Sequence, residues 1–476
     1  DSGNALYTTD ELTADNCVFD GNSGVSDEGV TVIAAGGKTL LVDRTSFTAN
    51  IGTALLVQSV VTLDGTPVAT GPFTITNSSF TSSDGVTIEV ELASPEDEYT
   101  STDVSIGAIS VLSNTFTISN SDGLNFGSLD VLRLTNSAVT VSDINVVGNS
   151  FSGGDNGIDW GSGYFEDLWE STITVGAVNI LNNDFTDNYT AILLEDAIGF
   201  YSMFTSTVSA GDVNIIGNTI SGYEDQGIVL DPFFSVSDWA GSSAGTLGNL
   251  IVNHNTVNTE QNASGGIFVQ HVNPRSFADT AVLTVGDTLI ENNQVNGGRS
   301  GIEPTIQGYY LYNDASVTLG TTTIQSNTIA ADGNGLDVAH EFAYYVYDNS
   351  RAEGAGVLIA SNTISVTGKG IAWAYNYQGY ENNQSSLVSV APITVTDNLI
   401  TAGTTGIYVE YYSSPEYMYD NAQLIMGPMA FADNVITSTN HSIQMYYDYD
   451  YYLGSDMTNN AYVKLPDHII RGNTFY

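Results

Sequence analysis

An asparagine recurs in this chain about every 36 residues, followed most often by a small or polar residue and then by a large apolar one. Successive members of the series are separated by 34 to 39 residues. They are Asn77, Asn114, Asn149, Asn183, Asn218, Asn255, Asn293, Asn327, Asn362, Asn398, Asn434 and Asn473. Internal repetition at a fixed period predicts a stack of similar structural units, one unit per repeat.

A second landmark, a small residue followed by an aliphatic one, comes eight to eleven residues after most of these asparagines, as in Gly157-Ile158 and Gly370-Ile371. Between the landmarks, apolar and polar residues alternate in short runs rich in Val, Ile and Thr, which is the pattern of β-strands. Gly, Asn, Asp and Ser separate the runs, and these residues supply tight turns. Helical periodicity is absent, so we expect an all-β protein.

The repeat length and the strand pattern together predict a single right-handed parallel β-helix over residues 1–476, with roughly 12–14 coils of about 36 residues. We expect irregular N-terminal coils over residues 1–76 and regular coils over residues 77–476. Equivalent residues of neighbouring coils would lie about 4.8 Å apart.

The recurring asparagine has a structural role in this fold. Stacked side-chain amides can hydrogen-bond one another from coil to coil and satisfy polar groups that a tight turn buries. The glycine before the aliphatic residue is expected to adopt a turn conformation closed to residues with a Cβ. The predicted ladder comprises Asn114, Asn149, Asn183, Asn218, Asn255, Asn293, Asn327, Asn362, Asn398 and Asn434.

The spacing of Asn-x-Ile/Phe and Gly-Ile over about residues 77–476 resembles the parallel β-helix repeats of the pectin-lyase-like superfamily. The N-terminal sequences Phe19-Asp-Gly-Asn22 and Phe47-Thr-Ala-Asn50 resemble the short repeats of polymorphic surface proteins and autotransporter passengers. The Gly-His-Gly and Arg-Ile-Lys signatures of polygalacturonases are missing, so no catalytic residue is carried over from that family.

Nine basic residues against 54 acidic ones give a net charge of −45, which disfavours nucleic acid and anionic membranes as partners and favours cations. No apolar run is long enough to span a membrane, and the first residues, Asp-Ser-Gly, suggest a mature product after removal of a signal segment. We therefore expect an extracellular or cell-surface location.

Cys17 is the only cysteine, so no internal disulfide can form. Sequons that permit glycosylation begin at Asn77, Asn188, Asn262, Asn383 and Asn440.

Segments rich in tyrosine and acidic residues follow many of the Gly-Ile pairs, and loops at matched positions of a solenoid line one face. Two interpretations stay open: the rings form a contact surface, or they fold back and bury themselves against the rod. The candidate assembly residues are Tyr309, Tyr310, Tyr344, Tyr345, Tyr411, Tyr412, Tyr446 and Tyr447, together with Phe475 and Tyr476 at the end of the chain.

Two carboxylate pairs are expected at equivalent positions of neighbouring coils, Glu303 with Asp337 and Glu195 with Asp231. Such pairs can bind calcium, the one candidate ion, although no cofactor is required. A separation of about 5 Å would also suit a retaining glycosidase. With 54 acidic residues, chance neighbours are the competing explanation. His271 and His340 are expected at the surface.

An uncapped solenoid end exposes a strand edge and apolar core, and stacking on another copy would cover both. Our first hypothesis is a secreted structural protein that polymerises head to tail into a filament, sheath or surface layer. An excised fragment without its caps would look the same. The alternatives are a polysaccharide-degrading enzyme or tailspike-like depolymerase, and an adhesin that binds cell-surface polysaccharide.

Overall fold

The computed structural model describes residues 11–21, 23–28, 31–33, 39–95, 99–259, 263–354, 356–376, 381–412, 417–448, 456–457, 460–464 and 466–476. These residues form strands and no helix, wound as a parallel β-solenoid of about 11 turns with about 35 residues per turn. The predicted all-β solenoid class is confirmed, with about 11 turns against the 12–14 coils expected.

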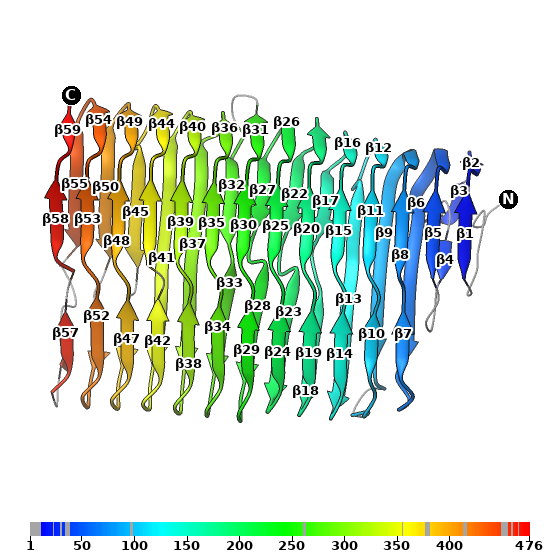
Figure 1. Ribbon diagram of the computed structural model, residues 1–476, viewed down its shortest axis with the longest axis horizontal. Coiled ribbons are helices and arrows are strands. Elements are labelled where there is room, and N and C mark those ends of the chain that lie inside the picture. The colour runs from blue at the N-terminus through cyan, green and yellow to red at the C-terminus, as the bar shows by residue number, and fades with distance from the viewer. Residues whose placement is uncertain are drawn as a thin grey trace. The chain divides into compact units, whose positions relative to one another are not determined.

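The chain divides into two compact units, Asp1–Phe233 and Phe234–Tyr476, and each is described by itself. The expectation of a single domain stays a prediction. Within each unit the strands belong to three parallel sheets, called A, B and C (Figure 1).

Unit 1 carries the N-terminal strands of each sheet. Sheet A contains β1 (Leu12–Asp15), β5 (Leu40–Asp43), β8 (Phe73–Thr76), β11 (Ile109–Leu112), β15 (Ile144–Val147), β20 (Val178–Leu181) and β25 (Val213–Ile216). Sheet C contains β7 (Val68–Thr70), β10 (Val104–Ile106), β14 (Ala138–Val141), β19 (Thr172–Val175) and β24 (Thr207–Ala210). Sheet B contains β2 (Val18–Asp20), β3 (Ser23–Glu28), β4 (Thr31–Ile33), β6 (Ser46–Thr62), β9 (Ser79–Ala93), β12 (Thr115–Ile118), β13 (Leu124–Thr135), β16 (Ser150–Ser152), β17 (Asn156–Trp160), β18 (Tyr164–Trp169), β21 (Asp184–Thr186), β22 (Thr190–Leu194), β23 (Ile198–Phe204), β26 (Thr219–Tyr223) and β27 (Gln226–Leu230).

Unit 2 repeats the arrangement. Sheet A contains β30 (Leu250–Asn253), β35 (Thr288–Glu291), β39 (Thr322–Gln325), β43 (Val357–Ala360), β48 (Ile393–Thr396), β53 (Met429–Ala432) and β58 (His468–Arg471). Sheet C contains β29 (Ala244–Leu247), β34 (Val282–Val285), β38 (Ser316–Leu319), β42 (Arg351–Gly354), β47 (Leu387–Val390), β52 (Gln423–Met426) and β57 (Tyr462–Lys464). Sheet B contains β28 (Phe234–Trp239), β31 (Thr256–Thr259), β32 (Gly265–Gln270), β33 (Val272–Phe277), β36 (Gln294–Asn296), β37 (Ser300–Leu311), β40 (Thr328–Ala331), β41 (Asn334–Val346), β44 (Thr363–Val366), β45 (Ile371–Asn376), β46 (Glu381–Asn382), β49 (Leu399–Ala402), β50 (Thr405–Tyr412), β51 (Tyr417–Met418), β54 (Val435–Ser438), β55 (His441–Asp448), β56 (Asp456–Met457) and β59 (Thr474–Phe475).

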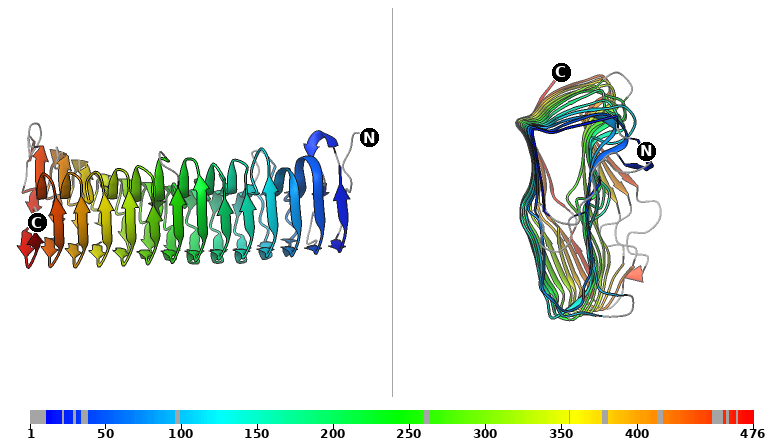
Figure 2. Two further views of the ribbon diagram at one scale, coloured as in Figure 1. Left: turned by 90° about the horizontal axis from the view of Figure 1, so that it is seen from above. Right: turned by 90° about the vertical axis from the view of Figure 1, so that its right-hand side faces the viewer.

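One turn of unit 1 passes through β15, then β16, β17 and β18, then β19, and the next turn begins at β20. Each strand pairs in parallel with its equivalent one turn later, so Ile144 lies opposite Val178 and Val146 opposite Ile180. Viewed end-on, successive turns within a unit follow nearly the same path (Figure 2). Equivalent residues of neighbouring turns therefore form columns that run from turn to turn.

The inward columns form the core. In unit 1 the apolar residue two positions after the asparagine is Phe116, Phe151 and Phe185 in three successive turns and Ile220 in the next, and the three rings stack with centroids 4.6 and 4.9 Å apart. In unit 2 the same position is aliphatic in the turns before the last, as in Ile329, Ile364 and Ile400, all at most 1% exposed, and is Phe475 after Asn473. Burial of each such side chain contributes about 1.5–3 kcal/mol.

The asparagines form hydrogen-bonded ladders inside each unit. In unit 1, the backbone N–H and Nδ2 of Asn149 both donate to Oδ1 of Asn183, at 2.9 and 3.0 Å, and Nδ2 also donates to the Val111 carbonyl at 2.8 Å. In unit 2, Asn327 makes the same pair of bonds to Asn362. The ladder asparagines are at most 2% exposed, so this network satisfies polar groups that water cannot reach.

The N-terminal end of the unit 1 ladder is formed by hydroxyl residues. The Ser78 backbone N–H donates to Asn114 Oδ1 at 2.9 Å, and the Thr45 N–H donates to Ser78 Oγ at 3.1 Å. Asn77, the first member of the sequence series, is exposed one residue earlier and donates to Asp43 Oδ1 at 3.0 Å instead. Its place in the series was therefore wrong by one residue.

The tight turn lies before the asparagine and not at the Gly-Ile pair. The residue preceding each ladder asparagine has a left-handed φ between 53 and 71°. Gly370 does not adopt a positive φ, but a Cβ there would lie 2.3 Å from Ile400 Cγ2 and 2.5 Å from the Gly406 carbonyl oxygen. The predicted turn role of this glycine was wrong, because close approach of successive turns excludes the side chain.

Candidate functional surfaces

Glu195 and Asp231 lie on neighbouring turns of unit 1, directly after β22 and β27, whose last residues Leu194 and Leu230 are register partners. Burial raises the pKa of both carboxyls, and nearby acids raise them further: Asp231 and Asp196 for Glu195, and Asp196 for Asp231. The pair therefore disfavours two full negative charges, which is the electrostatic condition that attracts a cation or retains a proton.

A second acidic pair in unit 1, Asp122 and Asp159, was missed by the sequence analysis. The Asn125 amide joins them, since Nδ2 donates to Asp122 Oδ2 at 3.0 Å and to Asp159 Oδ2 at 3.2 Å. Burial and then the charges of Asp122 and Glu195 raise the pKa of Asp159 to about 6. The signal was available, because Asp159 follows Gly157-Ile158 as Asp337 follows Gly335-Leu336.

Glu303 and Asp337 take neighbouring places in unit 2, since the residues before them, Ile302 and Leu336, are register partners on β37 and β41. Burial raises the pKa of Glu303, a hydrogen bond from Ser300 opposes the rise, and Asp337 adds to it. Asp337 Oδ2 accepts a hydrogen bond from Asn334 Nδ2 at 3.0 Å. A carboxyl with a raised pKa beside a second carboxyl is a feature that glycoside hydrolases share.

Among the described residues, no group of three or more His, Cys, Asp or Glu side chains is arranged to hold a metal ion. Each calcium site expected from the sequence, Glu195 with Asp231 and Glu303 with Asp337, offers two carboxylates. Calcium takes six to eight oxygen ligands, so each pair would supply only part of the ligand shell. Binding of calcium at these pairs stays a prediction.

Five tyrosines of unit 2, Tyr310, Tyr312, Tyr344, Tyr345 and Tyr347, form a continuous group that we call the tyrosine cluster. Tyr310 and Tyr345 are register partners whose rings stack with centroids 5.1 Å apart and planes 12° apart. Tyr312 stacks on Tyr347 in the same way at 5.3 Å. Tyr344 meets Tyr345 edge-on at 4.5 Å, and all five rings are partly buried.

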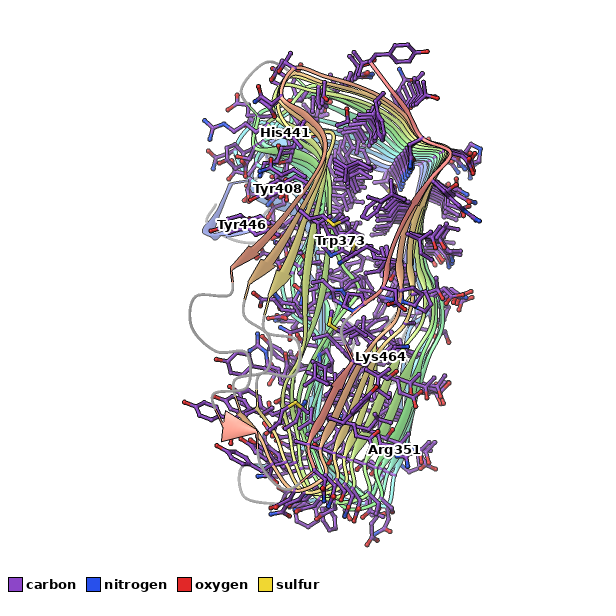
Figure 3. All side chains as sticks on the ribbon, turned by 90° about the vertical axis from the view of Figure 1, so that its left-hand side faces the viewer. Arg351, Trp373, Tyr408, His441, Tyr446 and Lys464 are labelled. Atoms are coloured by element: carbon purple, nitrogen blue, oxygen red, sulfur yellow. The ribbon has the colours of Figure 1, made fainter. Side chains whose placement is uncertain are left out.

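The cluster therefore combines features of both interpretations made from the sequence, because its rings cover one another and keep an exposed part. Tyr446 is more open, 46% exposed on the outer side of β55, whereas Trp373 on β45 is buried (Figure 3). The side chains of Tyr309, Tyr411, Tyr412 and Tyr447 lie outside the described ones.

Apolar side chains are exposed on the last described strands of unit 2. Among the described strands β58 pairs with β53, and it is exposed at all four residues, with Ile469 and Ile470 at 43% and 53%. Phe475 on β59 and Tyr476 are 50% and 75% exposed. This surface, defined by Ile469, Ile470, Phe475 and Tyr476, is called the edge patch below.

The two histidines expected at the surface are in the interior of unit 2. His271 and His340 are 6% and 0% exposed, and burial lowers the pKa of each to about 3, so both are neutral at pH 7. His271 Nδ1 lies 3.0 Å from Thr288 Oγ1, beside a cavity of about 30 Å³ that Thr322 and Gln307 also line. A cavity of this volume has room for a water molecule and not for a substrate.

The five sequons differ in access. Asn77 and Asn440 are exposed, Asn383 is partly buried, and Asn262 lies outside the described residues. Asn188 is 2% exposed and donates to the Gly153 carbonyl at 2.5 Å, so its amide is closed to a modifying enzyme in the folded protein.

Among the described residues, no helix is long and apolar enough to cross a membrane. Comparisons with protein-family models, with curated proteins and with solved structures gave no match.

Proposed function

We propose that this chain is a structural solenoid protein that associates with further copies of itself through the edge patch. The support is the exposure of Ile469, Ile470 and Phe475 on and beside β58, whose partner among the described strands is β53. An exposed strand edge offers unpaired backbone N–H and C=O groups, and apolar side chains next to it add burial when another strand docks.

In the proposed head-to-tail contact, β58 of one copy pairs with β1 of another. Among the described strands β1 pairs with β5, and it carries Leu12 and Ala14 at the positions equivalent to the buried Leu40 and Val42. A repeated contact of this kind does not close on itself and so produces a filament, sheath or layer. We further propose that the protein acts outside the cell or at its surface, and that its repeat belongs with those of the pectin-lyase-like superfamily.

The net charge of −45 opposes association of copies, so we propose that calcium or another multivalent cation promotes it. The register-paired acids Glu195 with Asp231 and Glu303 with Asp337 are the candidate positions.

The test compares the parent chain with Ile470→Asp and with Leu358→Asp by light scattering and sedimentation. Ile470→Asp puts a charge in the edge patch and is expected to leave monomers. Leu358 is a partly exposed outward residue of β43, away from that patch, so its variant should assemble like the parent. Equal assembly of all three chains would contradict the proposal.

A second candidate is hydrolysis of a polysaccharide by Glu303 and Asp337. The specific observation is that burial raises the pKa of Glu303 while Asp337 occupies the equivalent position one turn away. Glu303 would donate the proton and Asp337 would act as nucleophile. A screen of polysaccharides with the parent, Glu303→Gln and Asp337→Asn tests this, and binding without cleavage would indicate the adhesin alternative.

A further inference from the structure

The tyrosine cluster joins two turns of unit 2 that are distant in sequence. Tyr310 and Tyr345 differ by 35 residues, as do Tyr312 and Tyr347, yet each pair is in ring contact, at 5.1 and 5.3 Å between centroids. Tyr345 and Tyr347 lie 6.0 Å apart within one turn, so the four rings form a connected set.

The cluster also contains a proton acceptor. Glu381 on β46 is the register partner of Tyr345, and after burial its nearby carboxylate is the main cause of the raised pKa of the Tyr347 phenol. Loss of an electron from a phenol is accompanied by loss of its hydroxyl proton, so a carboxylate near the hydroxyl favours the oxidation by accepting that proton. The rings are partly exposed, and an oxidant in solution can therefore reach them.

We propose that the tyrosine cluster is a site of oxidative cross-linking, where a peroxidase acting with hydrogen peroxide joins Tyr310 to Tyr345 and Tyr312 to Tyr347 as dityrosine. This inference goes beyond the proposed function and does not depend on assembly.

Each tyrosine of a pair loses one electron to the oxidant and its hydroxyl proton to Glu381 or to water. The two tyrosyl radicals then form a carbon–carbon bond between ring carbons ortho to the oxygens. The hydrogens on those carbons move to the oxygens and restore both phenols. Overall, two tyrosines and one hydrogen peroxide give one dityrosine and two waters, so atoms and electrons balance.

The stacked rings must turn to bring their ortho carbons together, and rotation about the side-chain torsions provides this because neither ring is enclosed. The product is a covalent bond between turns that are otherwise joined by strand pairing, side-chain packing and the hydrogen bonds of the asparagine ladder. It would close a loop of 35 residues, as a disulfide does in proteins that contain one.

The experiment treats the full chain with a peroxidase and hydrogen peroxide, at a concentration where light scattering shows monomers. Digestion after acidic residues releases residues 292–314, because the Glu303–Pro304 bond is not cleaved, and residues 342–348, and these peptides hold the two sides of the cluster. We expect a joined peptide that has lost two hydrogen atoms, with fragment ions that place the bonds at Tyr310–Tyr345 and Tyr312–Tyr347.

Two variants make the assignment specific. Tyr345→Phe should remove the bond to Tyr310 and leave Tyr312 joined to Tyr347. Tyr462→Phe removes a tyrosine that is 52% exposed, outside the cluster, and should leave the yield of the joined peptide unchanged. Cross-links found chiefly between chains, through Tyr462 and Tyr476, would overturn the proposal, because yield would then follow exposure and not ring contact.

Discussion

Single side chains in this protein act as members of columns, and the asparagine column shows this best. Asn327 accepts from the backbone N–H and Nδ2 of Asn293, and donates with its own N–H and Nδ2 to Asn362 and with Nδ2 to the Ile290 carbonyl. Each amide is therefore the partner of two others, and removal of one leaves buried groups unpaired on both sides.

Replacement of Asn327 by Ala is expected to lower the free energy of unfolding by about 3 kcal/mol, because several buried donors and acceptors lose their partners. Asn440→Ala is the control, since Asn440 is exposed and the change should stay within about 0.5 kcal/mol. Urea denaturation of the three chains measures both effects. A similar small loss in the two variants would show that the ladder does not hold the turns together.

Asn382 presents the opposite case, a buried amide outside the ladder. It is 0% exposed, and neither its Oδ1 nor its Nδ2 has a hydrogen-bond partner among the described residues. Its register partners on the neighbouring turns are Val346 and Met418. Asn382→Leu should therefore raise the free energy of unfolding by about 1–2 kcal/mol, the desolvation cost of an unpaired amide. A loss in the same urea titration would mean that the amide has a partner, such as a buried water.

Two acids of unit 1 predict how stability depends on pH. Burial raises the pKa of Asp130 and Asp159 from 3.8 to about 6, so between pH 4 and 6 the folded chain holds more protons than the unfolded chain. The free energy of unfolding should therefore fall as pH rises through this window. Asp159→Asn should reduce this dependence of the unfolding free energy on pH. The control Asp314→Asn changes an exposed residue and should leave the dependence unchanged. Denaturation at a series of pH values tests this, and parallel slopes for all three chains would be inconsistent with it.

At the scale of the element, neighbouring turns approach each other closely at the Gly-Ile pair, and this approach limits the size of the side chain there. Gly335, Gly370 and Gly406 form a column in which a Cβ on one would meet the carbonyl oxygen of the next. Ala191 occupies the equivalent place in unit 1, so the column accepts an occasional methyl group where its surroundings have adjusted.

Gly370→Ala is expected to lower the free energy of unfolding by about 2 kcal/mol, the usual cost of overpacking a close contact. Gly161→Ala is the matched control, because a Cβ there meets nothing within 4 Å. It should leave stability unchanged or raise it by about 0.4–1 kcal/mol through the unfolded state. Equal stability of the two variants in thermal unfolding would exclude the close approach as the reason for glycine.

The sequence was sufficient for the fold because the repeat itself carries the register. A period near 36 residues, with Asn at one turn and Gly-Ile further along, leaves few ways to stack the strands. The residue with a left-handed φ before each ladder asparagine was harder to find from the sequence, because its type varies from turn to turn. It is Ser326 in one turn, Asn182 in another and Gly217 in a third. The inward side chains of His340 on β41 and of His271 between β32 and β33 were misplaced because polar residues at these positions break the simple alternation. The pairing of Asp122 with Asp159 depends on Asn125, a contact that spacing alone does not reveal.

At the scale of the whole molecule, charge and surface chemistry oppose each other. The net charge of −45 opposes contact between copies, while the edge patch offers exposed apolar side chains on and beside β58. Cations that reduce the repulsion should therefore shift the balance toward association.

The most direct measurement of the central proposal is negative-stain electron microscopy of the purified chain with and without millimolar calcium, alongside Ile470→Asp. The proposal predicts ordered filaments or sheets of the parent chain, more abundant with calcium, and dispersed particles of the variant. Dispersed parent particles under both conditions would contradict it.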